Sequence, residues 1–266
     1  MEINKINKAA NILYNSRINL KRIEKLPNDC EPKSLKEAYL IQDELTKIYL
    51  SADHNNKLVG KKIACTNKEA QAQLNVTESF IGNMFLNNIS KSNSEISPKF
   101  FFSPFVEPEF SFKMKKELEV SKAPFDFNTV YEAIDVVLPS IELVDSRYLD
   151  WTIVGTNNLI ADNAVHAHWI YGESKNNLNI FDFYNHSVDL FINNKLIERG
   201  NSSNVMENPV NSLTWLINNL AQNKKTLPKD YFITTGTCTK AIPIAIGDNV
   251  KADFGNLGNV SFSFKE

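Results

Sequence analysis

The sequence has no excess of either charge and no long apolar run. Its 29 lysine and arginine residues nearly balance its 31 aspartate and glutamate residues, and the formal net charge is −2. A basic patch large enough for nucleic acid is absent, as is a polyacidic tail, so we expect a small-molecule partner and no nucleic acid. No run is long enough to span a bilayer, and the N-terminus lacks the apolar core of a signal peptide. No membrane contact is therefore expected.

Cysteine is scarce, and its placement argues against a disulfide framework. Cys30, Cys65 and Cys238 are widely spaced and form no C-x-x-C pair. Free thiols in a reducing compartment are the favoured interpretation, with a disulfide or a catalytic cysteine as the alternatives. A cytoplasmic location is expected.

Several common site motifs are also missing. The chain contains no G-x-G-x-x-G, no P-loop, no G-x-S-x-G and no H-E-x-x-H. Nucleotide binding and serine hydrolysis consequently lose most of their support.

The periodicity of apolar residues changes along the chain. About the first third has helical spacing, with an amphipathic stretch at 4–16 and a capping-box pattern from Ser34 to Glu37. Strand-like runs follow, at 104–114, 136–148, 179–184, 187–197, 231–235, 249–254 and 259–264. Asn193 and Asn194 predict a hairpin turn, while Asn208 and Pro209 predict the start of a helix. We therefore predict an α+β fold, with a helical N-terminal segment at 1–60 on a mixed-β core at 61–266, or one continuous domain.

Two carboxylates lie one residue apart in an apolar, aromatic-rich segment at 105–113. In a strand, Glu107 and Glu109 would point to the same face and enter one pocket. Buried carboxylates repel each other and persist when a cation holds them, and hard oxygen donors suit Mg, Ca or Mn. The alternative is an exposed edge strand with a solvated pair, which Pro108 favours because proline belongs at edges and bulges.

Other acids and imidazoles extend this hypothesis. Glu142 lies in a second apolar run, and with Glu107 and Glu109 it would form a three-carboxylate cradle that leaves positions open for water and a bidentate ligand. In the same run, Asp145 and Arg147 could pair with each other. The spacing of His166 and His168 (Ala-Val-His-Ala-His-Trp) could place both imidazoles on one strand face as metal ligands. The alternative for the two histidines is a partly buried, hydrogen-bonded pair.

Ordered motifs along nearly the whole chain resemble one known family. These motifs are Glu-Ala-Tyr at 37–39, Val-Gly-Lys-Lys-Ile at 59–63 with Thr66, Gln-Leu at 73–74, Val-Glu-Pro-Glu-Phe-Ser-Phe at 106–112, Ile-Glu-Leu-Val-Asp-Ser-Arg at 141–147 with Trp151, Ala-Asp-Asn-Ala at 161–164, Asn-Pro at 208–209 with Trp215 and Leu216, Thr-Gly-Thr-Cys-Thr at 235–239, and Val-Lys-Ala-Asp-Phe-Gly at 250–255. Together they resemble the 2-keto-4-pentenoate hydratase and 2-oxo-3-hexenedioate decarboxylase group of the fumarylacetoacetate hydrolase superfamily.

The resemblance implies a mixed β-sandwich roll and Mg²⁺ or Mn²⁺ on Glu107, Glu109 and Glu142. It also implies a 2-oxo acid substrate bound through its carboxylate and 2-oxo oxygens, as in the catabolism of aromatic compounds. A metal acting there as a Lewis acid would stabilise an enolate at C2 and C3, which hydration and decarboxylation can share. A homo-oligomer, or assembly with a decarboxylase or hydratase relative, is further implied.

The resemblance also assigns roles to single residues. Lys62 would be catalytic, holding substrate charge or delivering a proton. Thr237 would donate its hydroxyl to the substrate carboxylate, and Asp162 and Asn163 would line the same pocket. Without the resemblance, Lys62 would be a solvated surface residue, and Thr237 and Asn163 would be ordinary turn residues.

Departures from the family pattern concern the chemistry more than the scaffold. Phe80 replaces an acid proposed to help move the proton, and Val165 replaces a serine. Phe105, Ala64 and Lys240 also differ from the usual residues. The metal ligands are kept while the acid–base groups change, so we expect His166 or His168 to be a substitute acid or base.

Three hypotheses follow from different classes. The first is a metal-dependent hydro-lyase of the 2-keto-4-pentenoate hydratase type. The second is a decarboxylase or C–C hydrolase of a 2-oxo acid such as 2-oxo-3-hexenedioate, oxaloacetate or an acylpyruvate. The third is a non-catalytic relative that retains the fold. The retained acids argue against it, because buried carboxylates without a ligand would destabilise the fold.

Overall fold

Two β-sheets pack face to face in the computed structural model, which describes residues 1–74 and 76–266. The larger, eight-stranded sheet has the order β2 (Phe80–Phe85), β1 (Leu58–Ala64), β10 (Phe232–Thr237), β5 (Phe105–Met114), β6 (Ile134–Val144), β7 (His166–Tyr171) and β3 (Ile89–Lys91), and β11 (Ile242–Pro243) pairs with β5. The second, five-stranded sheet has the order β4 (Ser94–Ile96), β13 (Asn259–Phe264), β12 (Asn249–Asp253), β8 (Ser187–Ile192) and β9 (Lys195–Asn201).

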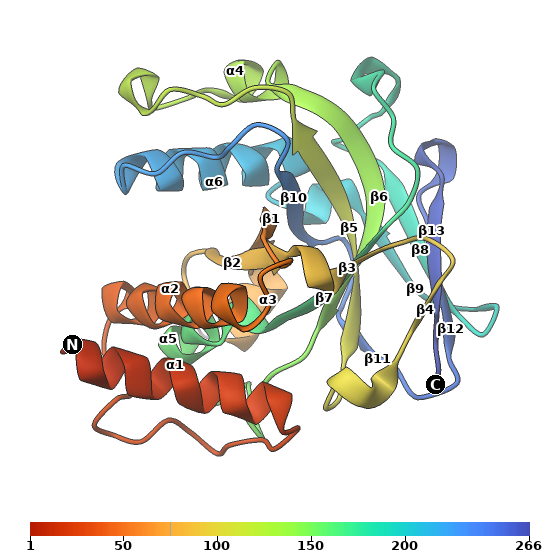
Figure 1. The fold of residues 1–266 in the computed structure, drawn as a ribbon. Helices are drawn as coiled ribbons and strands as arrows, with labels where there is room; N and C mark the ends of the chain where they lie inside the picture. The colour runs from red at the N-terminus through yellow and green to blue at the C-terminus, as the bar shows by residue number, and fades with distance from the viewer. Residues whose placement is uncertain (75) are drawn as a thin grey trace.

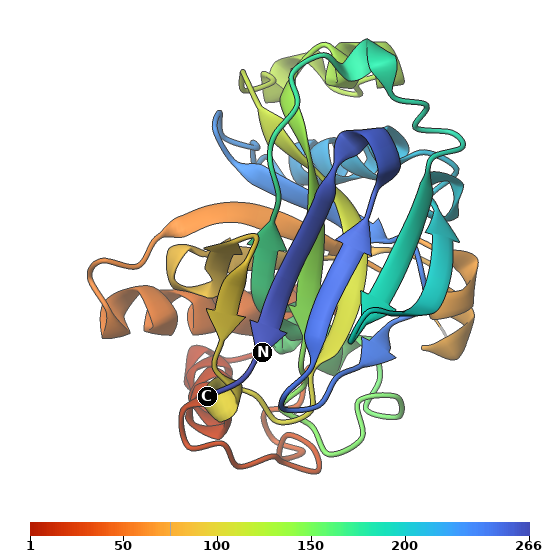
Figure 2. The same cartoon turned by 90° about the vertical axis from the view of Figure 1, so that its right-hand side faces the viewer.

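Long, strongly curved strands β5 and β6 run through the middle of the molecule, with the five-stranded sheet on one side (Figures 1 and 2). Phe110 of β5 contacts Phe254 at the end of β12, with ring centroids 5.2 Å apart. Apolar side chains of both sheets belong to one buried cluster, because each sheet turns one face inward. The predicted mixed-β, sandwich-like α+β fold is confirmed.

Helices cover the remaining parts of the large sheet (Figure 1). Their bounds are α1 (Ile3–Ile18), α2 (Leu35–Ala52), α3 (Lys68–Gln73), α4 (Phe127–Tyr131), α5 (Thr156–Ala161) and α6 (Pro209–Gln222). Leu13 of α1 and Leu45 of α2 share a buried cluster with Tyr148. The first two helices therefore rest on the segment that follows β6. Among the described residues, no helix combines the length and the apolar character needed to cross a membrane.

Turns and caps agree with the local sequence signals. Asn193 and Asn194 have φ of 52° and 63° and join β8 to β9, as the hairpin prediction requires. The Asn208 side chain accepts a hydrogen bond from Val210 N at the start of α6. Ser34 caps α2 by accepting from Glu37 N, whereas the Glu37 carboxylate accepts from Lys33 N and not from Ser34.

Three expectations about the elements are wrong. Strands β1 and β2 lie in the first third of the chain, for which helical spacing was expected, because both strands are largely buried and lack the alternation of a half-exposed strand. Residues 179–184 form no strand, and a 3₁₀ turn occupies Leu178–Ile180. The run at 136–148 stops being a strand at Val144, the end of β6.

Candidate metal centre

Strand β5 is not an edge strand. It pairs with β10 and β11 on one side and with β6 on the other, so the solvated-edge alternative is excluded. The Pro108 carbonyl accepts a hydrogen bond from Cys238 N, so the side of this residue that lacks an N–H faces β10. There the register is irregular between Thr234 and Thr237, and no ladder donor is required of the proline.

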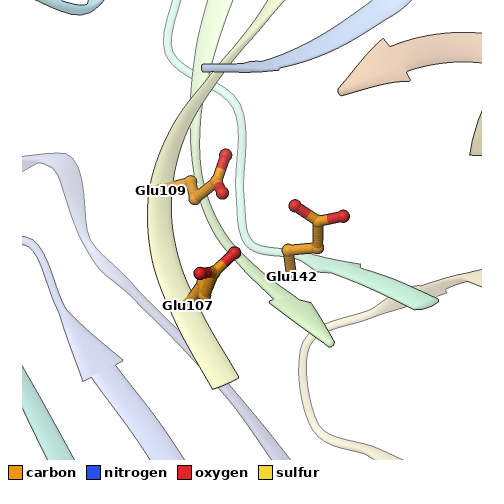
Figure 3. A group of neighbouring side chains, drawn as sticks. All are labelled: Glu107, Glu109 and Glu142. Carbon is orange, nitrogen blue, oxygen red and sulfur yellow. The ribbon is translucent and has the colours of Figure 1, made fainter. Parts of the chain in front are cut away.

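Glu107, Glu109 and Glu142 converge on one point. Glu107 lies directly opposite Glu142 in the β5–β6 register, and Glu109 lies two residues further along β5. Each offers a carboxylate oxygen, and these three oxygens all lie within 4.8 Å of one another. Figure 3 shows the side chains of both β5 acids directed toward that of Glu142. The predicted three-carboxylate group therefore exists as a cluster.

Glu109 is held in place by donors from β10. Its Oε2 accepts hydrogen bonds from the Thr234 hydroxyl and from Gly236 N, the latter at 2.7 Å. Gly236 has φ of +103°, and a Cβ built there would lie 1.8 Å from the Thr66 hydroxyl oxygen, so only glycine fits. Glu109 Oε1, although buried, has no hydrogen-bond partner in the described part of the chain. A buried oxygen left open in this way suits a cation.

Lys62 and His166 surround Glu142. Lys62 is only 2% exposed, and its Nζ lies 3.4 Å from Glu142 Oε2. His166 Nδ1 lies 2.7 Å from Glu142 Oε1 and donates to it, since an ionised carboxylate can only accept. One buried lysine thus faces three carboxylates, and a divalent ion would neutralise the negative charge that the lysine leaves uncompensated.

Burial and mutual repulsion set the protonation of the three acids. Burial raises the pKa of Glu107 to about 7 and the pKa of Glu109 well above its usual value, and the neighbouring carboxylates act in the same direction. Burial also disfavours the charged form of Glu142, but Lys62 and His166 outweigh it and lower its pKa. The pKa of Lys62 is raised because the glutamates overcome the effect of burial, so the lysine is charged.

A cavity of about 480 Å³ opens beside the cluster. Lys62, Glu107 and Thr237 line it, together with all five positions that depart from the family pattern: Ala64, Phe80, Phe105, Val165 and Lys240. Val165 has φ of 55°, a backbone conformation in which a β-branched residue is rare. The unusual residues therefore gather where a ligand would lie.

Other predicted site residues have contacts of their own. The Thr237 hydroxyl donates to Thr239 O at 3.0 Å, so binding a carboxylate would require it to exchange this bond. Asp162 is fully buried against Arg147, with Oδ1 2.9 Å from Nε, and burial raises its pKa to about 6. Asn163 clamps β2 through the N–H and C=O of Asn83. Neither Asp162 nor Asn163 lines the cavity, so their contact with substrate stays a prediction.

The two histidines have different contacts. His166 reaches Glu142, whereas His168 Nε2 lies 2.9 Å from the Ser90 hydroxyl on β3, and burial lowers the pKa of His168 to about 4. Neither imidazole lines the cavity. The expected pair of Asp145 and Arg147 is wrong, because Arg147 pairs with Asp162 and Asp145 pairs with Arg17.

The cysteines are free thiols, as predicted. Cys30 and Cys238 are buried, and Cys65 lines the cavity. Burial raises the pKa of Cys65 to about 12, which disfavours a catalytic thiolate at neutral pH.

Sequence reasoning missed the groups that hold Glu109. Thr234 was predicted only as part of a strand, and Gly236 and Thr66 were identified only as parts of the family motifs. Thr66 lines the cavity, and its buried hydroxyl has no hydrogen-bond partner in the described ranges. One signal for this arrangement was available in the sequence, a glycine between two threonines, which allows a positive φ at Gly236. That signal did not indicate a hydrogen bond to Glu109.

Known proteins resemble the chain over almost its full length. The 4-oxalocrotonate decarboxylase of Pseudomonas putida is 28% identical over 95% of this chain and 94% of that protein. The 2-oxo-hept-4-ene-1,7-dioate hydratase of Escherichia coli is 29% identical over 87% of each chain. A solved structure of 4-oxalocrotonate decarboxylase from Pseudomonas putida G7, complexed with magnesium and adipate, has a TM-score of 0.92 at 28% identity and covers 99% of this chain and 98% of that one. No family model matches the sequence.

The curled sheets and the acidic cluster between β5 and β6 define a fumarylacetoacetate hydrolase-type protein. Within that superfamily, the chain is similar over nearly its whole length to the 2-keto-4-pentenoate hydratase and 2-oxo-3-hexenedioate decarboxylase group, so the resemblance that the sequence motifs indicated is confirmed.

Proposed function

We propose that this protein is a divalent-metal-dependent lyase of a small 2-oxo acid, with hydration of a 2-hydroxydienoate as its leading reaction. The observation that carries the proposal is the convergence of Glu107, Glu109 and Glu142 beside the buried Lys62, at the side of a cavity of about 480 Å³. Hydratases and decarboxylases among the relatives support it. Assembly into a homo-oligomer, or with a hydratase or decarboxylase relative, belongs to the same proposal and rests on the resemblance.

The three glutamates would hold Mg²⁺ or Mn²⁺. Hard oxygen donors, an unpartnered Glu109 Oε1 and an excess of negative charge all fit such an ion. A bound ion supplies a Lewis acid for the carboxylate and 2-oxo oxygens of the substrate.

The protein's own groups would manage the protons and the orientation of the substrate. Lys62 lines the cavity and stays charged, so its Nζ is the group best placed to hold or deliver a proton. Thr237 would orient the substrate carboxylate by turning its hydroxyl away from Thr239 O. His166 would act through Glu142, and it is better placed than His168 as a substitute acid or base. Contact of Asp162 and Asn163 with the substrate belongs to the same proposal and rests on the resemblance.

Product analysis tests the reaction. With Mg²⁺ present, 2-hydroxypenta-2,4-dienoate is expected to give a 4-hydroxy-2-oxo acid, and the Glu107→Gln variant is expected to give none above the uncatalysed rate. Absence of turnover with every 2-hydroxydienoate and 2-oxo-3-enoate tried would contradict the lyase proposal.

Decarboxylation is the second candidate, and the cavity wall favours it. Phe80, Phe105, Trp151 and Val165 line the cavity and offer few partners for a reacting water. Loss of carbon dioxide needs no water to add to the substrate. Release of carbon dioxide from 2-oxo-3-hexenedioate, without a hydroxylated product, would therefore favour this alternative.

Metal binding should depend on pH. Because the pKa of Glu107 is raised to about 7, protons compete with the ion at this acid below that pH. Affinity for Mn²⁺ is expected to rise between pH 6 and pH 8. Calorimetry in two buffers of different ionisation enthalpy would reveal the proton released at pH 6.5, and a pH-independent affinity over this range would contradict the assignment.

A further inference from the structure

Arg22 brings a positive charge to the cavity at a distance from the metal cluster. It follows α1 and lines the cavity together with Leu149. Backbone hydrogen bonds fix its position, since Ile23 N donates to Arg147 O and Leu149 N donates to Ile23 O, each at 2.9 Å. Arg22 is therefore anchored to the segment that follows β6.

The anions around Arg22 are engaged by other groups. Arg147 pairs with Asp162, and Arg17 pairs with Asp145 through a side-chain hydrogen bond. Asp145 also accepts from two backbone N–H groups, those of residues 102 and 103. Arg22 Nη2 lies 3.9 Å from Asp145 Oδ1, too far for a hydrogen bond. Three arginines thus share two aspartates in this cluster, and Arg22 is the one whose charge is left over.

One donor of Arg22 is buried without an acceptor. Its Nε has no hydrogen-bond partner among the residues that the structure describes. The guanidinium packs over the Phe102 ring, 5.2 Å from its centroid, which orients the planar group. A buried donor on a charged group is costly unless an acceptor reaches it, and the cavity is where such an acceptor can enter.

The position of Arg22 beside Asp145 separates it from the metal cluster. Asp145 lies three residues beyond Glu142, just past the end of β6, and three extended residues span at most about 10 Å. Val144 and Leu149 also line the cavity. A ligand held at Glu107 and Lys62 would therefore extend along an apolar wall toward Arg22.

We propose that Arg22 binds a second carboxylate, so that the substrate is a 2-oxo dicarboxylic acid and not a 2-oxo monocarboxylic acid. The inference rests on the proposed function, because it assumes that the 2-oxo acid end lies at the glutamates. Arginine suits this role, since its planar fork matches the two oxygens of a carboxylate.

Lys240 also lines the cavity and is the other cation that could bind a second carboxylate. It is exposed, and it lies between Thr237, which pairs with Glu109, and Ile242, which pairs with Val106. This register puts Lys240 beside the metal cluster and not at the far end. Lys240→Gln is therefore the matched control for Arg22→Gln.

Calorimetric binding of 2-oxoadipate and 2-oxohexanoate in the presence of Mg²⁺ tests the inference without turnover. The two acids have the same number of carbons and differ by the terminal carboxylate. The wild type is expected to bind 2-oxoadipate at least about tenfold more tightly, as a charge-assisted pair warrants. Arg22→Gln should reduce this preference to within about twofold while leaving the affinity for 2-oxohexanoate unchanged, and Lys240→Gln should retain it.

Distinct results would overturn the inference. Equal binding of the two acids by the wild type, equal weakening of both by Arg22→Gln, or loss of the preference in Lys240→Gln would each do so while leaving the lyase proposal intact. Failure of both acids to bind the wild type would overturn the proposed 2-oxo acid site, and this inference with it. If Arg22→Gln does not fold, Arg22→Lys replaces it, and an undiminished preference in that variant overturns the role of the guanidinium fork.

Discussion

In a Glu107→Gln variant, Mn²⁺ is expected to lose its effect on Tm, and turnover should fall by more than about a hundredfold. The reason is that the amide removes one of three anionic ligands, and even groups one step behind a metal ligand typically cost 10–100-fold. Glu107 is the cleanest of the three acids to change, because Glu109 is also held by Thr234 and Gly236 and Glu142 by Lys62 and His166. Thermal unfolding with and without Mn²⁺ measures the effect.

Without metal, the same variant should be at least as stable as the wild type above pH 7. Burial raises the pKa of Glu107 in the folded protein, so its ionisation costs stability as pH rises from its usual value of 4.5 through about 7. The amide avoids that cost, and its advantage should shrink as pH falls below 7 and disappear only below about pH 4.5, where Glu107 is protonated in both the folded and the unfolded wild type. Glu117→Gln, at an exposed glutamate, is the matched control and should alter neither Tm nor its response to Mn²⁺. A full Mn²⁺ response in Glu107→Gln would mean that the ion binds elsewhere.

The acidic cluster could be predicted because its members lie on two adjacent long strands. An i, i+2 pair in an apolar strand must share a face, and Glu142 lies in the next strand along the chain, directly opposite Glu107. Neighbouring strands in sequence commonly pair in space. Local patterns therefore predicted that the three acids could lie together while leaving the edge-strand alternative open, and they were sufficient for the β8–β9 hairpin and for the start of α6.

Contacts across long sequence separations could not be predicted in this way. Thr234 is 125 residues from Glu109, and Arg17 is 128 residues from Asp145. The expected local pair of Asp145 and Arg147 fails because β6 has ended at Val144, where the strand alternation no longer decides side-chain direction. Each of these side chains then finds a partner that only the tertiary fold supplies.

Strands buried on both faces caused the other errors. β2 is buried at every position, and β1 is at least partly buried throughout, so neither has a polar face that would reveal a period of two. Lys62, on β1, was identified by the family motif at 59–63 and not by the apolar pattern of its strand. A lysine that is 2% exposed in an apolar strand is a strong functional signal, but the burial is known only from the fold.

In a Lys62→Met variant, the metal-free protein is expected to melt roughly 10 °C below the wild type at pH 8. Removing one partner of a buried ion pair costs about 3–5 kcal/mol, and each kcal/mol lowers Tm by about 2–4 °C in a chain of this size. The loss should shrink as the pH falls below 7, because the uncompensated carboxylates then take up protons, Glu107 with its raised pKa among them. Thermal unfolding at several pH values checks this dependence.

Adding Mn²⁺ to Lys62→Met separates the two roles of the lysine. The charge of the ion can replace the lysine beside the carboxylates, so much of the lost Tm should return, whereas turnover should not, because methionine carries no proton to transfer. Lys61→Met is the matched control: Lys61 is adjacent on β1, points to the opposite face and hydrogen-bonds to the Asn83 side chain. It should lose only about 1 kcal/mol, with no rescue by metal and with turnover retained. If Mn²⁺ restored turnover as well as Tm in Lys62→Met, the only role of Lys62 would be to neutralise the carboxylates, and another group would transfer the proton.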